Sequence, residues 1–204
     1  MTNLRKSIKD SIRAKKSLIK SEKTINSIIE EIYFKIKKGG KILLCGNGGS
    51  AADAQHLAAE FLVRLRPKIN RKPIKALSLA TDISTITACG NDYSFDKIYS
   101  RTLEALGNYN DILIVISTSG NSKNIINVLK LAKKKGIKTI GFLGFNGGKA
   151  KKYCNYSIVI KSKNVARIQE SHIFLGHYIF EMVEEKFIKS EKKWNNILWT
   201  KKII

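Results

Sequence analysis

The chain has 204 residues, 43% of them hydrophobic, which is enough for one domain with a sizeable core. No run approaches the roughly 20 consecutive apolar residues of a membrane helix, and residues 1–20 lack the apolar core of a signal peptide, so we expect no membrane association and a cytoplasmic location. The formal net charge is +22, and the three cysteines are too widely spaced to predict a disulfide framework or a zinc knuckle.

Residues 1–38 are predicted to be helical, because they contain no Gly or Pro and carry isoleucines at helical spacing from Ile25 to Ile36. Gly39-Gly40 then ends this segment. Beyond it, short apolar runs alternate with helical segments. The predicted strands span residues 41–45, 75–80, 111–116, 138–143 and 156–160. Helices are expected from Ala51, over 82–89 and 95–106, from the end of the 117–122 loop to Lys135, and over about 165–189, before a polar C-terminal segment.

Strands that alternate with helices predict a parallel sheet with helices on both faces. Ligands of such folds bind beyond the carboxyl ends of the strands. The sequence has no linker, short repeat or low-complexity segment, so we expect a single domain over residues 1–204. Residues 1–38 would form its N-terminal helical extension, and residues 41–190 its α/β core.

The loop Ser117-Thr-Ser-Gly-Asn-Ser122 follows a predicted buried strand and holds four hydroxyl groups in six residues. Backbone N–H groups at a helix start, together with hydroxyl donors, make an anion site without a fixed positive charge. Alternatively, Ser119 or Ser122 is only a helix N-cap. Because a cap needs one such residue and not four, the loop favours phosphate binding.

A second loop, Gly46-Asn-Gly-Gly-Ser50, also lies between a predicted strand and a helix. It lacks the lysine of a Walker A loop and does not match the GxGxxG dinucleotide pattern. By itself it is weak evidence, since glycine-rich turns at this position are common. Together with the hydroxyl loop, it suggests a second polar wall of one pocket.

Three histidines lie on predicted helices, and each could simply be packed or hydrogen bonded in the structure. His56 and Glu60 are spaced i, i+4 and project from one helix face, as surface pairs often do. Gln169 and His177 share a face of the last helix, where His172 is a further candidate for a supporting role. The pair Asn91-Asp92 would ordinarily be interpreted as a turn.

Four separated motifs follow one another along the chain: GNGGSAADAQHLAAE at 46–60, GND at 90–92, ISTSGNS at 116–122, and ARIQESH at 166–172 followed by His177. Through them the sequence resembles the phosphoheptose isomerase family of sugar-isomerase (SIS) domain proteins over roughly residues 20–190. The resemblance implies a flavodoxin-like parallel five-stranded sheet flanked by helices. It also implies a homotetramer with active sites at subunit interfaces.

The activity implied by the resemblance is isomerisation of sedoheptulose 7-phosphate to D-glycero-D-manno-heptose 7-phosphate, for bacterial surface heptoses in lipopolysaccharide or capsule. Glu60 and His177 resemble the catalytic pair, and the family's zinc site, one per subunit, matches His56, Glu60, Gln169 and His177. The residues that would contact the substrate are Asn47, Gly48, Gly49, Glu60, Asn91, Asp92, Ser117, Thr118, Ser119, Ser122 and Gln169. A side chain bound to a metal is a poor proton carrier, so the role of Glu60 and His177 as metal ligands conflicts with their role as the catalytic pair.

Other functions stay open at this level. The high positive charge is compatible with nucleic-acid binding. Base readout favours arginine, however, and here lysine outnumbers arginine and is scattered along the chain. We therefore favour a solvated lysine-rich surface and expect no specific nucleic acid. The alternatives are a non-catalytic phosphosugar-binding or replication-initiator-associated protein of the same fold, and an isomerase for another phosphosugar. Glu60 and His177 favour an enzyme.

Overall fold

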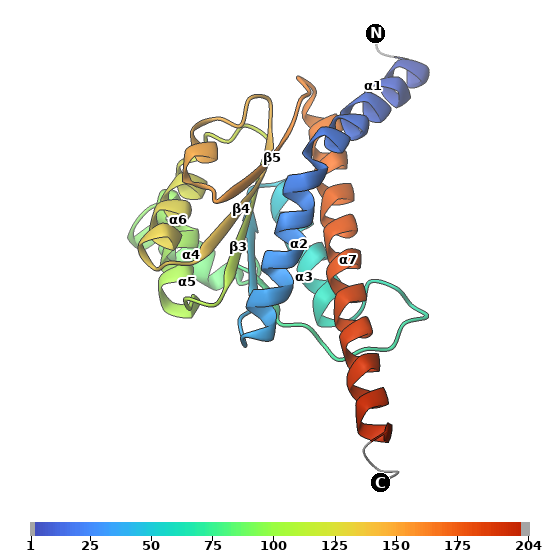
Figure 1. The fold of residues 1–204 in the computed structure, drawn as a ribbon. Coiled ribbons are helices and arrows are strands. Elements are labelled where there is room, and N and C mark those ends of the chain that lie inside the picture. The colour runs from blue at the N-terminus through green and yellow to red at the C-terminus, as the bar shows by residue number, and fades with distance from the viewer. Residues whose placement is uncertain (1–2, 201–204) are drawn as a thin grey trace.

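The computed structural model describes the backbone of residues 3–200 and the side chains as far as Ser190 (Figure 1). Its centre is a parallel sheet of five strands in the order β2-β1-β3-β4-β5. This flavodoxin-like order places a topological switch point between β1 and β3, where ligands of such sheets bind. The predicted fold class is confirmed. The strands are β1 (Ile42–Gly46), β2 (Ala76–Ser78), β3 (Ile112–Ser117), β4 (Lys138–Gly144) and β5 (Tyr156–Ile160).

Helices cover both faces of the sheet, with three on each side (Figure 1). One face carries α2 (Glu22–Lys37), α3 (Gly49–Leu62) and α7 (Val165–Thr200). The other carries α4 (Ile83–Asp92), α5 (Ile98–Leu106) and α6 (Lys123–Lys134). Helix α1 (Leu4–Lys16) packs on α7, and short 3₁₀ turns occupy Ser17–Ser21, Phe95–Lys97 and Lys149–Tyr153.

The central strands are buried on both faces, which explains their almost continuous apolar sequences. Ile42 and Leu44 of β1 pack into the core under α2, α3 and α7, whereas Leu43 and Cys45 pack into the core under α4, α5 and α6. Burial without a charged partner raises the pKa of the Cys45 thiol, so this residue is an inert part of the packing.

Apart from shifts at element ends, the predicted elements were confirmed with four differences. The helical segment 1–38 is interrupted by the 3₁₀ turn at Ser17–Ser21, and the segment 95–106 begins with a 3₁₀ turn before α5. Asn91-Asp92 forms the end of α4 rather than a separate turn. The predicted end of the last helix at about residue 189 was wrong, because α7 continues to Thr200. Gly176 is the last glycine, and no proline follows it, so the sequence offers no signal that would end the helix earlier.

Helices in the described range 3–200 include none that is both long enough and apolar enough to cross a membrane. The division into an N-terminal extension and a core over residues 41–190 stays a prediction.

Candidate active site

The glycine loop connects β1 to α3 at the carboxyl edge of the sheet. Gly48 is the N-cap of α3 and has a φ of 57°, in the left-handed region that glycine adopts without strain. No side chain caps the helix there. The N–H groups of Ser50 and Ala51 already donate to the carbonyls of Asn47 and Gly48, at 3.1 and 2.9 Å. The donors that remain for a ligand in this loop are those of Gly48 and Gly49.

A reciprocal amide pair joins the glycine loop to α6. The Asn47 side-chain amide donates to Oδ1 of Asn124 at 3.0 Å, and the Asn124 amide donates back to Oδ1 of Asn47 at 2.8 Å. The Tyr99 hydroxyl also donates to Oδ1 of Asn47 at 3.2 Å and bonds the carbonyl of Gly46. Asn124 is fully buried. Sequence reasoning missed Asn124 and Tyr99, because nothing local distinguishes them from ordinary helix residues.

The hydroxyl loop lies beside the glycine loop, since β3 is the sheet neighbour of β1. Ser122 occupies the N-cap position of α6, but its side chain makes no capping hydrogen bond. Ser119 Oγ accepts from the N–H of Asn121 at 3.1 Å, inside the loop and not inside the helix. The interpretation of these serines as caps alone is therefore not supported, and the start of α6 keeps free donors for an anion.

Glycine also allows this loop to approach the loop after β4. Gly120 has a φ of 64°, and a Cβ there would lie 2.1 Å from the carbonyl oxygen of Gly147. The hydroxyl groups of Thr118, Ser119 and Ser122 stay partly exposed, whereas Ser117 is buried and accepts from the N–H of Gly120 at 3.1 Å. Three of the four predicted hydroxyl groups are thus accessible to a ligand.

The two predicted histidine positions meet across α3 and α7. His56 Nε2 and His177 Nε2 lie 2.9 Å apart, and His56 Nε2 lies 3.2 Å from Oε1 of Glu60. One ligand atom of each residue lies within 4.8 Å of those of the other two. Side chains 121 residues apart are thereby brought into one cluster, with the His56 side chain 51% exposed and that of Glu60 21% exposed.

The electrostatics of the cluster favour a neutral imidazole at His177. Partial burial lowers the pKa of His177, the proximity of His56 lowers it further, and the Glu60 carboxylate opposes the shift. A neutral His177 can donate a hydrogen bond to a substrate oxygen while Glu60 accepts a proton.

Gln169 lies eight residues before His177, which is about 12 Å along the axis of α7. A Cβ on Gly49 would lie 2.7 Å from the Gln169 side-chain nitrogen, so this amide is at the glycine loop. Asn91 and Asp92 are exposed at the end of α4, where the Asn91 amide donates to Asp92 at 2.9 Å. The assigned substrate and metal roles of these residues stay predictions.

His172 is outside the cluster and fully buried. Neither of its ring nitrogens makes a hydrogen bond within the part of the chain whose side chains are described. Burial lowers the pKa of His172 to about 4, and the nearby backbone of Leu143 opposes the shift only partly. His172 is therefore a neutral core residue that supports α7, in line with the supporting role considered for it.

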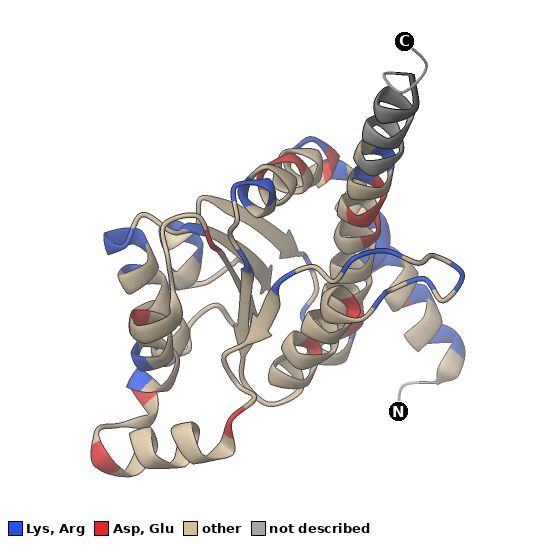
Figure 2. Cartoon of the chain, turned by 90° about the horizontal axis from the view of Figure 1, so that it is seen from below, with Lys and Arg blue, Asp and Glu red and all other residues tan. Residues whose placement is uncertain are grey.

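Basic residues are spread over the helices and loops on several sides of the sheet, with fewer acidic residues among them (Figure 2). Near the hydroxyl loop, Ser119 and Asn121 line an open depression with Lys151, Lys161 and Lys163. The electrostatic potential at this edge is thus positive and suits an anionic substrate.

Comparison with known proteins identifies the family of the chain. Residues 7–144 match the SIS domain family. The phosphoheptose isomerase of Clostridium acetobutylicum is 47% identical over 182 residues, which cover 88% of this chain and 92% of that protein. That of Campylobacter concisus is 51% identical over 152 residues, covering 74% and 79% of the two chains.

Solved structures show the same similarity. A phosphoheptose isomerase from Francisella tularensis matches with a TM-score of 0.85 and 34% identity, covering 91% of this chain and all of that one. The enzyme from Neisseria gonorrhoeae matches with a TM-score of 0.81 and 38% identity, covering 88% and 95%. Such relatives favour an enzyme over a non-catalytic binding protein. The chain is a sugar-phosphate isomerase that belongs to the phosphoheptose isomerase family of SIS-domain proteins.

Proposed function

We propose that the chain interconverts sedoheptulose 7-phosphate and D-glycero-D-manno-heptose 7-phosphate in the cytoplasm, for the heptoses of lipopolysaccharide or capsule. The observation that supports this most is the cluster of Glu60 with His56 and His177 at the carboxyl end of α3, while the glycine and hydroxyl loops lie toward the other end of that helix. The cluster offers a carboxylate base and an imidazole, and the loops offer a phosphate anchor.

Glu60 carries the proton in the mechanism that we propose. Interconversion of a ketose and an aldose moves a proton between adjacent carbons through an enediol, so one base must reach both carbons. His177, neutral because its pKa is lowered, donates to the sugar oxygens during ring opening and enolisation. The same division between a glutamate and a neutral histidine operates in triosephosphate isomerase.

The two loops hold the ends of the substrate in this proposal. The free N–H groups of α6 and the hydroxyl groups of Ser119 and Ser122 bind the phosphate, while the glycine loop and Gln169 contact the sugar. Binding the phosphate far from the reacting carbons fixes the sugar relative to Glu60, which turns binding energy into orientation.

A zinc ion fits the donor set at this cluster. His56, Glu60 and His177 offer nitrogen and oxygen atoms within 4.8 Å of one another, which suits zinc, whereas Gln169 approaches Gly49 instead. We propose one zinc per subunit, with Gln169 as its fourth ligand in the assembled protein. When bound, the metal would polarise the sugar oxygens as a Lewis acid. Glu60 is free to act as a base only in molecules where its carboxylate is not engaged by the metal.

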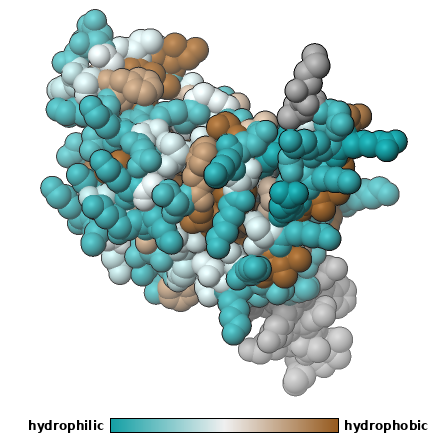
Figure 3. All heavy atoms as spheres, turned by 90° about the horizontal axis from the view of Figure 1, so that it is seen from above, coloured by the Kyte–Doolittle hydropathy of each residue, from teal (hydrophilic) through white to brown (hydrophobic). Residues whose placement is uncertain are grey.

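We propose a homotetramer in which the sites lie at subunit interfaces. Leu4, Ile8 and Ile12 form an exposed apolar stripe on α1, spaced four residues apart. Ile19 and Phe174 are also exposed nearby, beside a groove between the 17–25 region and α7. Figure 3 shows apolar side chains gathered in patches between hydrophilic ones on one face. A second copy of the chain would cover such surface.

The experiment that tests the function is turnover of sedoheptulose 7-phosphate, followed with deuterium exchange from solvent at the transferred position. Glu60→Gln keeps the shape of the side chain but removes the base, so turnover should fall about 100- to 10,000-fold. Glu104→Gln, at an exposed position of α5, is the matched control. Near-normal exchange in Glu60→Gln would refute the assigned base. Binding of the sugar without exchange in the unchanged protein would refute the enzymatic proposal.

A further inference from the structure

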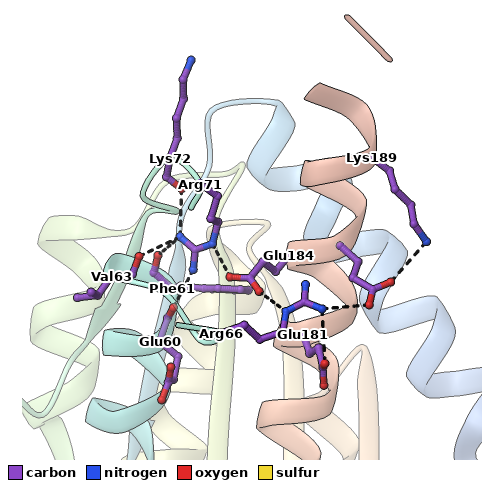
Figure 4. Close-up of polar contacts among 10 residues, drawn as sticks. Glu60, Phe61, Val63, Arg66, Arg71, Lys72, Glu181, Glu184 and Lys189 are labelled. Carbon is purple, nitrogen blue, oxygen red and sulfur yellow. Dashed lines mark hydrogen bonds and ion pairs between the residues drawn. The ribbon is translucent and has the colours of Figure 1, made fainter. Parts of the chain in front are cut away.

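A buried ionic cluster joins the connection between α3 and β2 to α7 (Figure 4). Arg71 Nε donates to Oε1 of Glu184 at 2.7 Å, and Arg66 Nε donates to Oε2 of the same carboxylate at 2.8 Å. The Glu184 side chain is 0% exposed and that of Arg71 is 2% exposed. Arg66 extends the cluster outward to Glu181 and Glu185.

Arg71 also binds the end of the helix that carries the proposed base. Its Nη2 donates to the backbone carbonyl of Glu60 at 2.8 Å, and its Nη1 donates to that of Phe61 at 2.9 Å (Figure 4). The last carbonyls of a helix have no partner within the helix, so a buried end needs donors from elsewhere. One guanidinium therefore fixes the backbone of Glu60 and holds the buried carboxylate of Glu184.

Glu184 lies on the same face of α7 as His177, because seven residues are about two turns. Between these positions, the ring of Phe180 stacks on that of Phe61 with centroids 3.8 Å apart and planes 1° from parallel. The planar fork of Arg71 thus bridges α3 and α7 just beyond the stacked rings.

We propose that Arg71, held by Glu184, is a positioning residue that sets the placement of Glu60 against His177. This inference rests on the proposed function, in which those two side chains act on one substrate. An arginine suits the position because its rigid fork donates in several directions at once, to a carboxylate and to two carbonyls. A lysine ammonium has no such fork and cannot keep this geometry.

The test uses the full-length protein and two kinds of variant. Arg71→Met alone leaves the Glu184 carboxylate without one of its buried partners and could unfold the chain. The double variant Arg71→Met/Glu184→Leu removes both charges, and apolar replacement of a buried ion pair is often tolerated. In the folded double variant, we expect kcat to fall about 10- to 100-fold. KM should stay within about threefold, because the phosphate loop lies at the other end of α3.

Asp111→Asn is the matched control. Asp111 is 2% exposed and pairs with Lys41 at 2.7 Å, at the amino-terminal edge of the sheet, so its loss weakens the fold without touching the α3–α7 contact. Each rate is measured at a temperature where circular dichroism shows the variant to be folded. We expect unchanged kcat in this control, and in Arg71→Lys a kcat as low as in the double variant.

A kcat within threefold of the unchanged protein in the double variant would overturn the inference, as would a loss confined to KM. If the unchanged protein neither turns over nor exchanges the heptose phosphate, the proposed function fails separately. Crystal structures of both proteins then decide the positioning role. Two separations in the double variant decide it: 2.9 Å from His56 Nε2 to His177 Nε2, and 3.2 Å from His56 Nε2 to Glu60 Oε1. Retention of both would overturn the inference, and a change in either would support it.

Discussion

Replacing Gly176 with alanine should push apart the two helices that carry Glu60 and His177. A Cβ at Gly176 would lie 2.5 Å from Cδ1 of Leu57 and 2.7 Å from its Cδ2, whereas ordinary contact begins at 3.4 Å. Leu57 is fully buried, so any turn of its side chain would press on neighbouring core residues. If Leu57 keeps its position, the contact opens by about 0.9 Å, the difference between 3.4 and 2.5 Å.

An opening of this size should affect both stability and rate. Overpacking a core typically destabilises by about 1–3 kcal/mol. A misplacement of about 1 Å can lower a rate about 100-fold, so we expect kcat to fall between 10- and 100-fold, roughly, with KM little changed. Urea unfolding and heptose phosphate turnover measure the two effects. Gly90→Ala controls for stability, since no atom lies within 4 Å of the added carbon.

Combining Gly176→Ala with Leu57→Ala tests the steric cause. Leu57→Ala alone should destabilise by about 2–5 kcal/mol, because it leaves a cavity. In the double variant the new methyl group occupies part of that cavity, so its destabilisation should be smaller than the sum, and kcat should recover. Two results would refute the view that the close approach of α3 and α7 at Gly176 determines the distance between Glu60 and His177. One is additive losses of stability in the double variant, and the other is an unchanged kcat in Gly176→Ala.

Ser119→Ala/Ser122→Ala should raise KM at least about tenfold, since donors to the phosphate are lost, and an unchanged KM would place the phosphate elsewhere. His172 has a pKa of about 4 when folded against an ordinary value of 6.5, so the unfolded state binds the extra proton between these values and stability falls as pH drops through that range. The loss of stability should reach about 3 kcal/mol at low pH, because one pKa unit corresponds to 1.36 kcal/mol. Urea unfolding over a range of pH measures it, and the loss should be absent in His172→Phe. The same dependence of unfolding free energy on pH in both proteins would contradict the prediction. Ile8→Glu/Ile12→Glu should lower the mass measured by light scattering below that of the expected tetramer, and a wild-type mass in that variant would exclude α1 from the interface.

Much of the fold could be predicted because the local sequence pattern of each segment favours the same element that packing in the sheet requires. Tyr156–Ile160 was predicted with its observed bounds, since an apolar run between polar residues leaves little choice. Helix α7 was predicted too short, because the sequence after residue 189 becomes more polar although no Gly or Pro ends the helix there. The 3₁₀ turn at Ser17–Ser21 carries no Gly or Pro signal either.

The site could be predicted only in part. The glycine and hydroxyl loops follow from their chemistry and from the rule that parallel strands end at one edge. The meeting of His56 with His177 could be expected only through family resemblance, because the packing of α3 on α7 decides it. The contact between Arg71 and Glu184 could not be predicted, since 113 residues separate them in the sequence and neither lies in a recognisable motif.

The amide pair of Asn47 and Asn124 joins the glycine loop to the start of α6, just after the hydroxyl loop, without any ion. Salt screens attraction between exposed charges over about 10 Å at 0.1 M, but it does not weaken a hydrogen bond between neutral groups in the same way. Ionic strength should therefore act on how often an anionic sugar arrives at this strongly basic protein, and not on the arrangement of the loops that receive it. In kinetic terms, the bimolecular encounter is the salt-sensitive stage, while the bound complex keeps the same shape from dilute buffer to physiological salt.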